Sequence, residues 1–211
     1  WMKAPNGEDT NLNEQQWLQV RTPAFKQWFG DWENDPDNAS KVVDDNGEPK
    51  IMYHGSPSDF NEFDLSAPIL NGRGEGEGFY FIQDISIAKR YATRKGNIKS
   101  VYLSIKKPFK GFHSLTKEDK SVYLKTKSNA EAYDKLGIDG FIVGGQHIVR
   151  NPNDIKSATD NAGTFDSNNN DIRYSQGADG MKFSRAGGMN DELDPRNIAK
   201  ETATRLYDLA S

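Results

Sequence analysis

The sequence predicts an α+β fold, because short strand patterns and short helix patterns follow one another without a regular βαβ repeat. Four apolar or alternating runs beside turn residues are typical of strands, at residues 50–54, 78–82, 100–105 and 141–149. Gly144 and Gly145 interrupt the last run. Helical periodicity lies between the strands, at residues 86–94 and 128–136. This irregular order predicts the α+β class.

Residues 11–32 are rich in aromatic side chains and predict two short helices. Their apolar residues suit one helical stripe: Trp17, Val20, Phe25, Trp28 and Phe29. Proline is tolerated in the first turn of a helix and not in its interior, so the two helices are expected to join at Thr22-Pro23. The aromatic side chains require a surface on which to be buried.

The helix predicted over residues 128–136 carries signals at both ends. Ser128 and Glu131 have the spacing of a capping box, in which each side chain hydrogen-bonds the backbone at the other residue. Gly137 stands where a helix C-terminus favours a left-handed residue.

The composition becomes strongly polar after Ser157, where Asn, Asp, Gly and Ser dominate. Such a segment buries too little apolar surface to offset the entropy of ordering, so we expect an extended wrap or linker. We therefore divide the chain into four parts: an N-terminal helical lead-in over 1–47, a core over 48–158, a polar extended tail over 159–193 and a C-terminal helix over 194–211.

The composition also excludes several classes of function. The 211 residues include 27 Lys and Arg against 31 Asp and Glu, and no basic block stands out, which disfavours nucleic acid as an electrostatic partner. No cysteine is present, which excludes disulfides, thiolate catalysis and Cys-ligated metals. No apolar stretch approaches the roughly 20 residues of a membrane helix. Trp1 before Met2 suggests a piece of a longer chain.

A metal site is not expected from the histidines. His54, His113 and His147 lie far apart in the sequence and form no helical pair of ligands. The glycine-rich run at 72–78 lacks the Lys-Ser/Thr of a phosphate-binding P-loop, so a mobile loop is the favoured interpretation. Such a loop can still close over a ligand, with Arg73 positioned to meet a phosphate.

Three fragments carry more information than these features: Tyr53-His-Gly-Ser56, Gly78-Phe-Tyr-Phe81 with Tyr91 downstream, and Gln146-His-Ile-Val149 followed by Asp154-Ile155. In this order they resemble the NAD-binding core of the diphtheria-toxin and poly-ADP-ribose-polymerase type of ADP-ribosyltransferase. That family ends its first strand with a His in an H-G-S or H-G-T motif. It carries a Tyr on a G-x-Y-F strand, a second Tyr eleven residues later, and a Glu, sometimes a Gln, at the start of a late strand.

The resemblance implies an ADP-ribosyltransferase fold in which two facing, mostly antiparallel sheets form an NAD cleft with flanking helices. NAD would be consumed as a substrate, and no metal is required. The bond between nicotinamide and ribose breaks through a transition state in which the ribose becomes cationic. The residues of the site must therefore hold the nicotinamide flat and fix the ribose while charge develops.

By this resemblance, Tyr80 and Tyr91 sandwich the nicotinamide ring, although both also suit ordinary core packing. Gly55 offers backbone groups to the carboxamide, with a simple turn as the alternative. His54 hydrogen-bonds a ribose hydroxyl of the adenosine half, and Ser56 reinforces that contact; the alternative is a structural histidine.

Gln146 departs from the family pattern. The family's glutamate hydrogen-bonds the 2′-hydroxyl of the nicotinamide ribose, and its charge favours the cationic transition state. Glutamine keeps the hydrogen bond and loses the charge, which is expected to slow the chemical step about 10²- to 10³-fold. Three explanations remain open: a native transferase with a tolerated Gln, a degenerate NAD binder, or a deliberate Glu→Gln substitution. Ala88, where polymerase-type members often have Ser, implies modest NAD affinity.

A narrower resemblance spans about residues 16–174 and is to the ADP-ribosyltransferase modules of phage and prophage polyvalent proteins. It implies a mono-ADP-ribosyltransferase that acts on a macromolecular acceptor, a protein rather than a nucleic acid, with no membrane partner. A soluble module in the bacterial host cytoplasm, after phage delivery or prophage expression, would follow. The alternatives are an NAD-binding module without turnover, an NAD glycohydrolase toxin, and a virion component whose packing only resembles these motifs.

Overall fold

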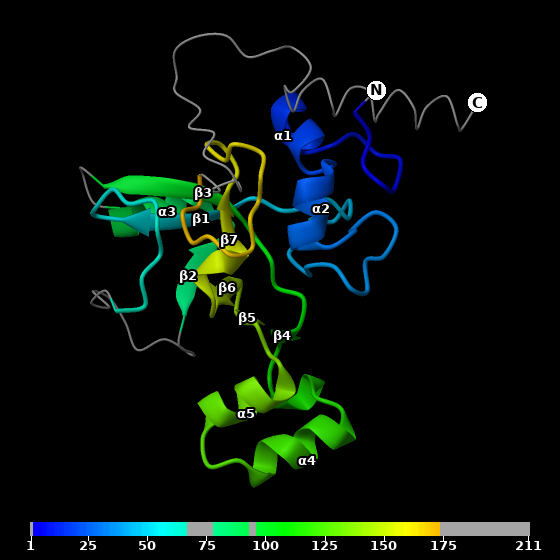
Figure 1. Cartoon of the computed structure of the whole chain (residues 1–211), viewed down its shortest axis with the longest axis vertical. Coiled ribbons are helices and arrows are strands. Elements are labelled where there is room, and N and C mark those ends of the chain that lie inside the picture. The colour runs from blue at the N-terminus through cyan, green and yellow to red at the C-terminus, as the bar shows by residue number, and fades with distance from the viewer. Residues whose placement is uncertain (1, 67–77, 93–95, 174–211) are drawn as a thin grey trace.

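The computed structural model describes residues 2–66, 78–92 and 96–173. Figure 1 shows helices at two ends of a sheet, with α1 and α2 on one side and α4 and α5 projecting from the other end. The helices are α1 (Glu14–Gln19), α2 (Pro23–Phe29), α3 (Ile85–Ala92), α4 (Lys117–Lys125) and α5 (Asn129–Leu136), with short 3-10 turns at Phe112–Ser114 and Pro152–Asp154. The strands are β1 (Met52–Ser56), β2 (Phe79–Ile82), β3 (Asn97–Leu103), β4 (Pro108–Phe109), β5 (Gly140–Val143), β6 (Gln146–Val149) and β7 (Ile155–Ser157). The predicted α+β class is confirmed.

The seven strands form one continuous sheet in the order β4-β5-β6-β2-β1-β3-β7. All neighbours are antiparallel except β4 and β5, which are parallel. β1 pairs with β3 along its whole length, whereas it pairs with β2 at one position, Tyr53 opposite Ile82. The two predicted sheets are therefore the two halves of a single sheet, joined at this one pair. We call the line between β1 and β2 the seam.

Two strand boundaries differ from the prediction. β1 runs to Ser56 because Gly55 and Ser56 pair with Ile98 and Asn97 of β3, so His54 lies inside the strand and does not end it. The predicted strand over 141–149 is a hairpin. Gly144 and Gly145 both have positive φ, 59° and 80°, which is the backbone of a tight turn whose twist matches that of the strands.

The N-terminal helices form as predicted, and each begins at a polar cap. The Asn13 side chain accepts a hydrogen bond from the Gln16 backbone, and Thr22 caps α2 with Pro23 in the first turn. Their aromatic side chains are buried in one cluster with Tyr102 of β3 and with Phe165. The Phe25 ring lies 5.2 Å from Tyr102 and 4.9 Å from Phe165. The surface that these aromatics require is thus the sheet itself.

A buried charged cluster joins the N-terminal helices to the residues before β1. The Arg21 guanidinium lies 3.9 Å from the Trp17 ring and 4.9 Å from the Trp32 ring. Its Nη2 donates to Glu48 Oε1 at 2.9 Å, and the Thr10 hydroxyl donates to the other Glu48 oxygen. Glu48 is fully buried, so its charge depends on these donors.

Residues 158–173 contain no helix or strand and lie over β7, with Phe165 and Ile172 buried. The Ser157 N–H donates to the Ile172 carbonyl at 2.8 Å, and the buried Lys156 ammonium donates to the Asn169 carbonyl. The rest of the predicted tail and the helix predicted over 194–211 lie outside the described residues. None of the described helices is long and apolar enough to cross a bilayer.

Replacing Arg21 by Met should lower the free energy of unfolding by about 3 kcal/mol, because the buried Glu48 carboxylate loses its cationic partner. Denaturant unfolding followed by tryptophan fluorescence measures the change. Lys3→Met is the matched control, since it removes an exposed ion pair, Lys3 with Asp9, and should cost much less. Equal losses in the two variants would contradict a structural role for the buried pair.

Candidate active site

The imidazole of His54 occupies the seam. β1 and β2 stop pairing after Tyr53, and the His54 ring reaches across to the Tyr80 backbone with 2.9 Å between Nδ1 and the carbonyl oxygen. A carbonyl only accepts, so Nδ1 carries the proton and donates. Burial lowers the pKa of His54, and the ring is therefore neutral at pH 7. The second nitrogen, Nε2, is left as an acceptor with no hydrogen-bond partner in the described part of the chain.

Aromatic side chains fix the orientation of the His54 ring. Phe60, Phe63 and Phe81 have ring centroids 5.9, 5.1 and 5.6 Å from it. The first two meet the imidazole edge to face, which is a favourable arrangement for aromatic pairs. With Nδ1 bound to the backbone and the ring packed on several sides, the direction of Nε2 is set before any ligand arrives.

Gly55 brings α3 into direct contact with β1. A Cβ at this position would lie 1.9 Å from the Ala88 carbonyl oxygen, so only glycine permits this approach. Ala88 itself is 1% exposed and faces the strand. α3 also contacts β2, and its last turn carries Tyr91, which is 48% exposed. The close approach thus sets how far Tyr91 stands from the sheet.

The backbone of Gly55 is directed toward the seam. Tyr53 of β1 lies opposite Ser100 of β3. The Ser100 carbonyl accepts a hydrogen bond from the Ala158 N–H, 2.8 Å away on the β7 side, so the backbone groups of this pair point away from each other. Tyr53 therefore directs its own N–H and C=O toward β2. Gly55 is two residues further along and has the same orientation. No residue of β2 pairs with it, which leaves its N–H and C=O facing the gap between the strands.

Tyr80 and Gln146 lie on one face of the sheet. Gln146 pairs with Ile82, and Tyr80 is two residues from Ile82, so the two side chains are diagonal neighbours on adjacent strands. Gln146 begins β6 next to the glycine turn and is exposed, whereas Tyr80 is half-buried against the cluster that contains Ile148. Among the described residues, Gln146 makes no hydrogen bond to His54.

Of the predicted residues, those on β1, β2 and β6 lie on both faces of the sheet near the seam, in two groups. His54, with its ring against Phe81, belongs to the opposite face from Tyr80 and Gln146, and the Tyr80 backbone connects the two groups. Ser56 follows on β1, and its hydroxyl accepts from the Ser58 N–H at 3.2 Å. Arg73 lies outside the described residues. Gly55 lies on β1 at the seam, and α3, which packs against Gly55, carries Tyr91.

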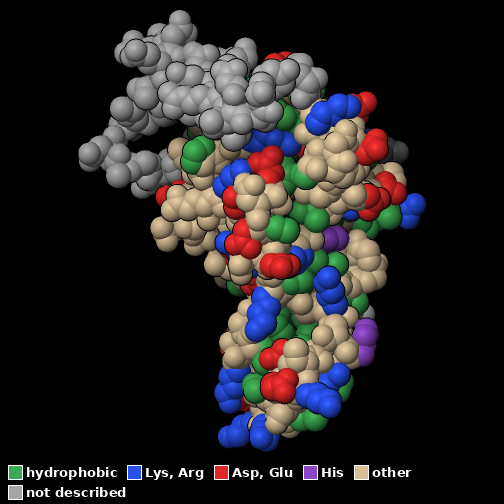
Figure 2. Space-filling model, turned by 90° about the vertical axis from the view of Figure 1, so that its right-hand side faces the viewer, with side chains coloured by type: hydrophobic (Ala, Val, Ile, Leu, Met, Phe, Trp, Pro, Cys, Tyr) green, Lys and Arg blue, Asp and Glu red, His purple; other side chains and the backbone are tan. Residues whose placement is uncertain are grey.

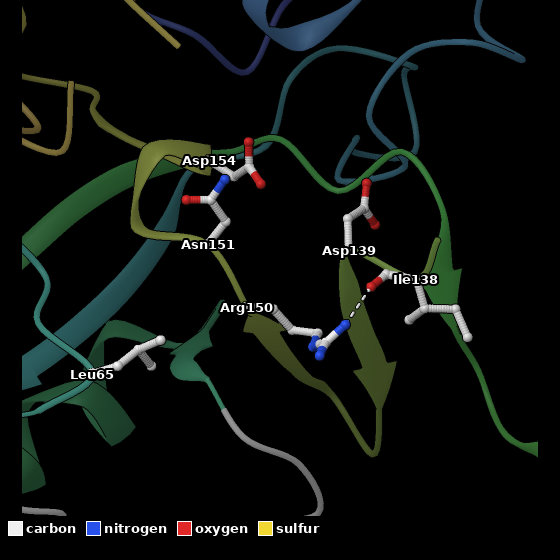
Figure 3. Close-up of a pocket in the computed structure, with 6 residues that line it drawn as sticks. All are labelled: Leu65, Ile138, Asp139, Arg150, Asn151 and Asp154. Carbon is white, nitrogen blue, oxygen red and sulfur yellow. Dashed lines mark hydrogen bonds between the residues drawn. The ribbon is translucent and has the colours of Figure 1, made fainter. Parts of the chain in front are cut away.

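A separate pocket of about 320 Å³ lies beside the β5–β6 hairpin (Figure 3), and the sequence prediction missed it. It is lined by Leu65, Ile138, Asp139, Arg150, Asn151 and Asp154. Burial and the neighbouring Asp139 raise the pKa of Asp154 to about 6. The Asp139 carboxylate accepts backbone hydrogen bonds from Lys106 and Lys107. No local pattern in the sequence indicates this pocket, because its lining residues come from separate segments that meet only in the fold.

The other histidines stand apart from the seam. His147 pairs with Phe81 and has a buried Nδ1 without a hydrogen-bond partner, and burial lowers its pKa to about 4. His113 lies in the exposed 3-10 turn before α4. Across the described ranges, no group of three His, Cys, Asp or Glu side chains is arranged to hold a metal ion.

A family model, ADP-ribosyltransferase in polyvalent proteins, matches residues 44–165, which is more than half of the chain. The chain belongs to this family. The resemblance predicted from the motifs is thus confirmed over 44–165, a range that includes every strand from β1 to β7. ADP-ribosyl transfer is accordingly the general function of this polyvalent-protein ADP-ribosyltransferase domain. No curated protein matches the chain, and no solved structure does.

Gly55→Ala should lower the free energy of unfolding of this ADP-ribosyltransferase domain by about 3 kcal/mol, because the added methyl group overlaps the Ala88 carbonyl and must displace α3. Gly144→Ala is the control. No atom lies within 4 Å of a Cβ there, so only the backbone strain of a positive φ remains, at about 1 kcal/mol. Thermal or denaturant unfolding measures the loss of stability in both variants. A loss in Gly55→Ala no larger than that in Gly144→Ala would contradict the close approach of α3 to β1.

Proposed function

We propose that the domain binds NAD at the seam and transfers a single ADP-ribose to a protein acceptor. NAD supplies the ADP-ribosyl group, which becomes reactive when the bond to nicotinamide breaks. The observation that carries the proposal is the His54–Tyr80 hydrogen bond, 2.9 Å long, at the point where β1 and β2 separate. It leaves one oriented acceptor nitrogen and one unpaired stretch of backbone on neighbouring residues of β1.

His54 and Gly55 would hold the dinucleotide at its two ends. Nε2 of the neutral imidazole accepts from a ribose hydroxyl, which donates a proton without requiring a charge on the ring. The N–H and C=O of Gly55 match the C=O and NH₂ of a carboxamide, and the absence of a side chain lets the ring approach the strand. Both groups therefore fit the ligand that the family uses.

Tyr80, Tyr91 and Gln146 would surround the reacting bond. The two phenol rings come from β2 and α3 and would sandwich the nicotinamide. The exposed amide of Gln146, on the same face as Tyr80, would hydrogen-bond the hydroxyl of the nicotinamide ribose. An amide orients the sugar but adds no negative charge, so the developing cation receives little electrostatic stabilisation from this position.

The neutral amide also supports a second candidate function, an NAD-binding module with little or no turnover. NAD binding needs only the hydrogen-bonding groups and the aromatic rings described above, and a glutamine at position 146 leaves all of them in place. Turnover needs stabilisation of charge, which Gln146 does not supply. The two candidates differ only in the release of nicotinamide, and this difference can be measured.

His54→Asn should weaken NAD binding about tenfold while the fold is retained. The Asn amide N–H replaces Nδ1–H toward the Tyr80 carbonyl, but the side chain has no equivalent of Nε2. Calorimetric titration with NAD measures the affinity, and thermal unfolding without NAD checks the fold. His113→Asn changes an exposed histidine far from the seam and should leave the affinity unchanged. Unaltered NAD affinity in a folded His54→Asn protein would show that NAD does not bind at His54.

Gln146→Glu should raise the rate of transfer from labelled NAD by about 10²-fold, since it restores a negative charge beside the developing cation, with NAD affinity nearly unchanged. The assay follows nicotinamide release and incorporation of label into a bacterial protein extract. Gln146→Ala, which lacks both charge and amide, should not gain activity.

The same assay separates the alternatives. Free ADP-ribose formed without any protein acceptor would indicate glycohydrolysis instead of transfer. NAD binding without nicotinamide release in either the original or the Glu variant would indicate a binding module. An unchanged or lower rate in a folded Gln146→Glu protein would remove Gln146 from the reaction.

A further inference from the structure

The helical hairpin of α4 and α5 projects from the end of the sheet, away from the seam (Figure 1). It is attached through β4 and β5 and through one apolar cluster. The Tyr133 ring lies 5.2 Å from Phe109 and 4.9 Å from Phe141, and Val122 and Tyr123 of α4 pack against the same cluster. These contacts fix which side of α4 faces the domain and which side faces solvent.

The outward side of α4 is defined by five residues at positions i, i+3, i+4, i+7 and i+8, which share one helical face. They are Lys117, Lys120, Ser121, Leu124 and Lys125, and we call them the α4 outer face. All are exposed except Lys120, which is half-buried with its ammonium 5.7 Å from the Phe112 ring. The face contains three lysines and no acidic residue.

The lysines of this face are not ion-paired within the described residues, and the acidic residues of α4, Glu118 and Asp119, lie outside the face. Segment 106–137 has eight lysines and four acidic residues, although the whole chain carries a net charge of −4. On α5, Glu131 already pairs with Lys135 and Asp134 pairs with Arg150. The three lysines of the outer face form no ion pair with any described residue. Figure 2 shows basic side chains around this projecting end of the molecule.

An apolar side chain lies among these lysines. Leu124 is 72% exposed, the largest exposed fraction among the described large hydrophobic residues, and Phe112 beside Lys120 is 41% exposed. A phosphate backbone gains nothing from an exposed leucine, and arginine, the residue best suited to phosphate recognition, is absent from the face. A protein segment that combines carboxylates with an apolar side chain complements both features.

From these observations we propose that the α4 outer face is a docking site for an acidic protein segment with an apolar anchor. The carboxylates would face Lys117, Lys120 and Lys125, and the anchor would cover Leu124. The site lies on a different part of the fold from the seam, so the proposal does not depend on NAD binding or on transfer.

Fluorescence anisotropy with a labelled peptide of about twelve residues tests the proposal, the peptide carrying Asp and Glu around a central Leu pair. The 211-residue chain should bind it, and the affinity should fall as ionic strength rises from about 0.05 to 0.3 M, because exposed charges are screened. The triple variant Lys117→Ser/Lys120→Ser/Lys125→Ser should lose at least tenfold in affinity. The matched control Lys3→Ser/Lys89→Ser/Arg90→Ser removes equal charge elsewhere and should lose much less.

The apolar half of the proposal is tested separately. Leu124→Ser should weaken binding about fivefold to tenfold, and so should replacing the peptide leucines by serine, because the buried apolar contact is lost in both. All the altered side chains except Lys120 are exposed, and circular dichroism checks that each variant is folded. Equal affinity of the triple variant and its control would overturn the proposal. Tighter binding of a single-stranded oligonucleotide of the same charge, lost in the triple variant, would replace it with a nucleic-acid surface.

Discussion

The organisation of the domain depends on the hydrogen bond between the His54 ring and the Tyr80 carbonyl. At this position a side chain replaces the backbone partner that an uninterrupted sheet would supply. The Tyr80 carbonyl accepts from the imidazole, β1 and β2 do not pair beyond Tyr53, and the neighbouring Gly55 backbone has no partner on β2. The same bond selects the neutral tautomer, and burial lowers the pKa in support of it. One contact therefore determines both the shape and the hydrogen-bonding character of the seam.

The N-terminal helices belong to the same packed core as the sheet. Tyr102 on β3 and Phe165 in the segment after β7 share one aromatic cluster with Phe25 and Trp28, and the Trp28 indole donates to the Asn153 carbonyl at 3.0 Å. The predicted boundary at residue 47 thus separates segments that are buried together, beside the Arg21–Glu48 pair. Packing of the N-terminal helices on Tyr102 holds β3 in position, and β3 in turn holds β1 through their strand pairing.

Features with local signals could be predicted from the sequence, and features that arise from distant contacts could not. The apolar stripe and the position of Pro23 predicted α1 and α2, and signals at both ends predicted α5. Ser128 and Gly137 act as expected at the two ends of α5, although Glu131 accepts from Lys127 and not from Ser128. α4 was missed because its outer face is basic and its periodicity is weak. The placement of His54 in mid-strand depends on pairing with β3, which lies more than forty residues away. The Asp154 pocket likewise needs the hairpin to bring its lining residues together.

The single pair that joins β1 to β2 has a mechanical consequence. Every other antiparallel junction in the sheet contains at least three paired positions, so each resists bending with several hydrogen bonds. Between the β6 half and the β3 half, the sheet itself is joined only by Tyr53 with Ile82 and by the imidazole bridge, while α3 and the buried core also pack against both halves. Strand pairing is thus sparsest along the line proposed for the ligand, and a ligand that hydrogen-bonds to both strands would add the cross-strand bonds that the backbone does not make there.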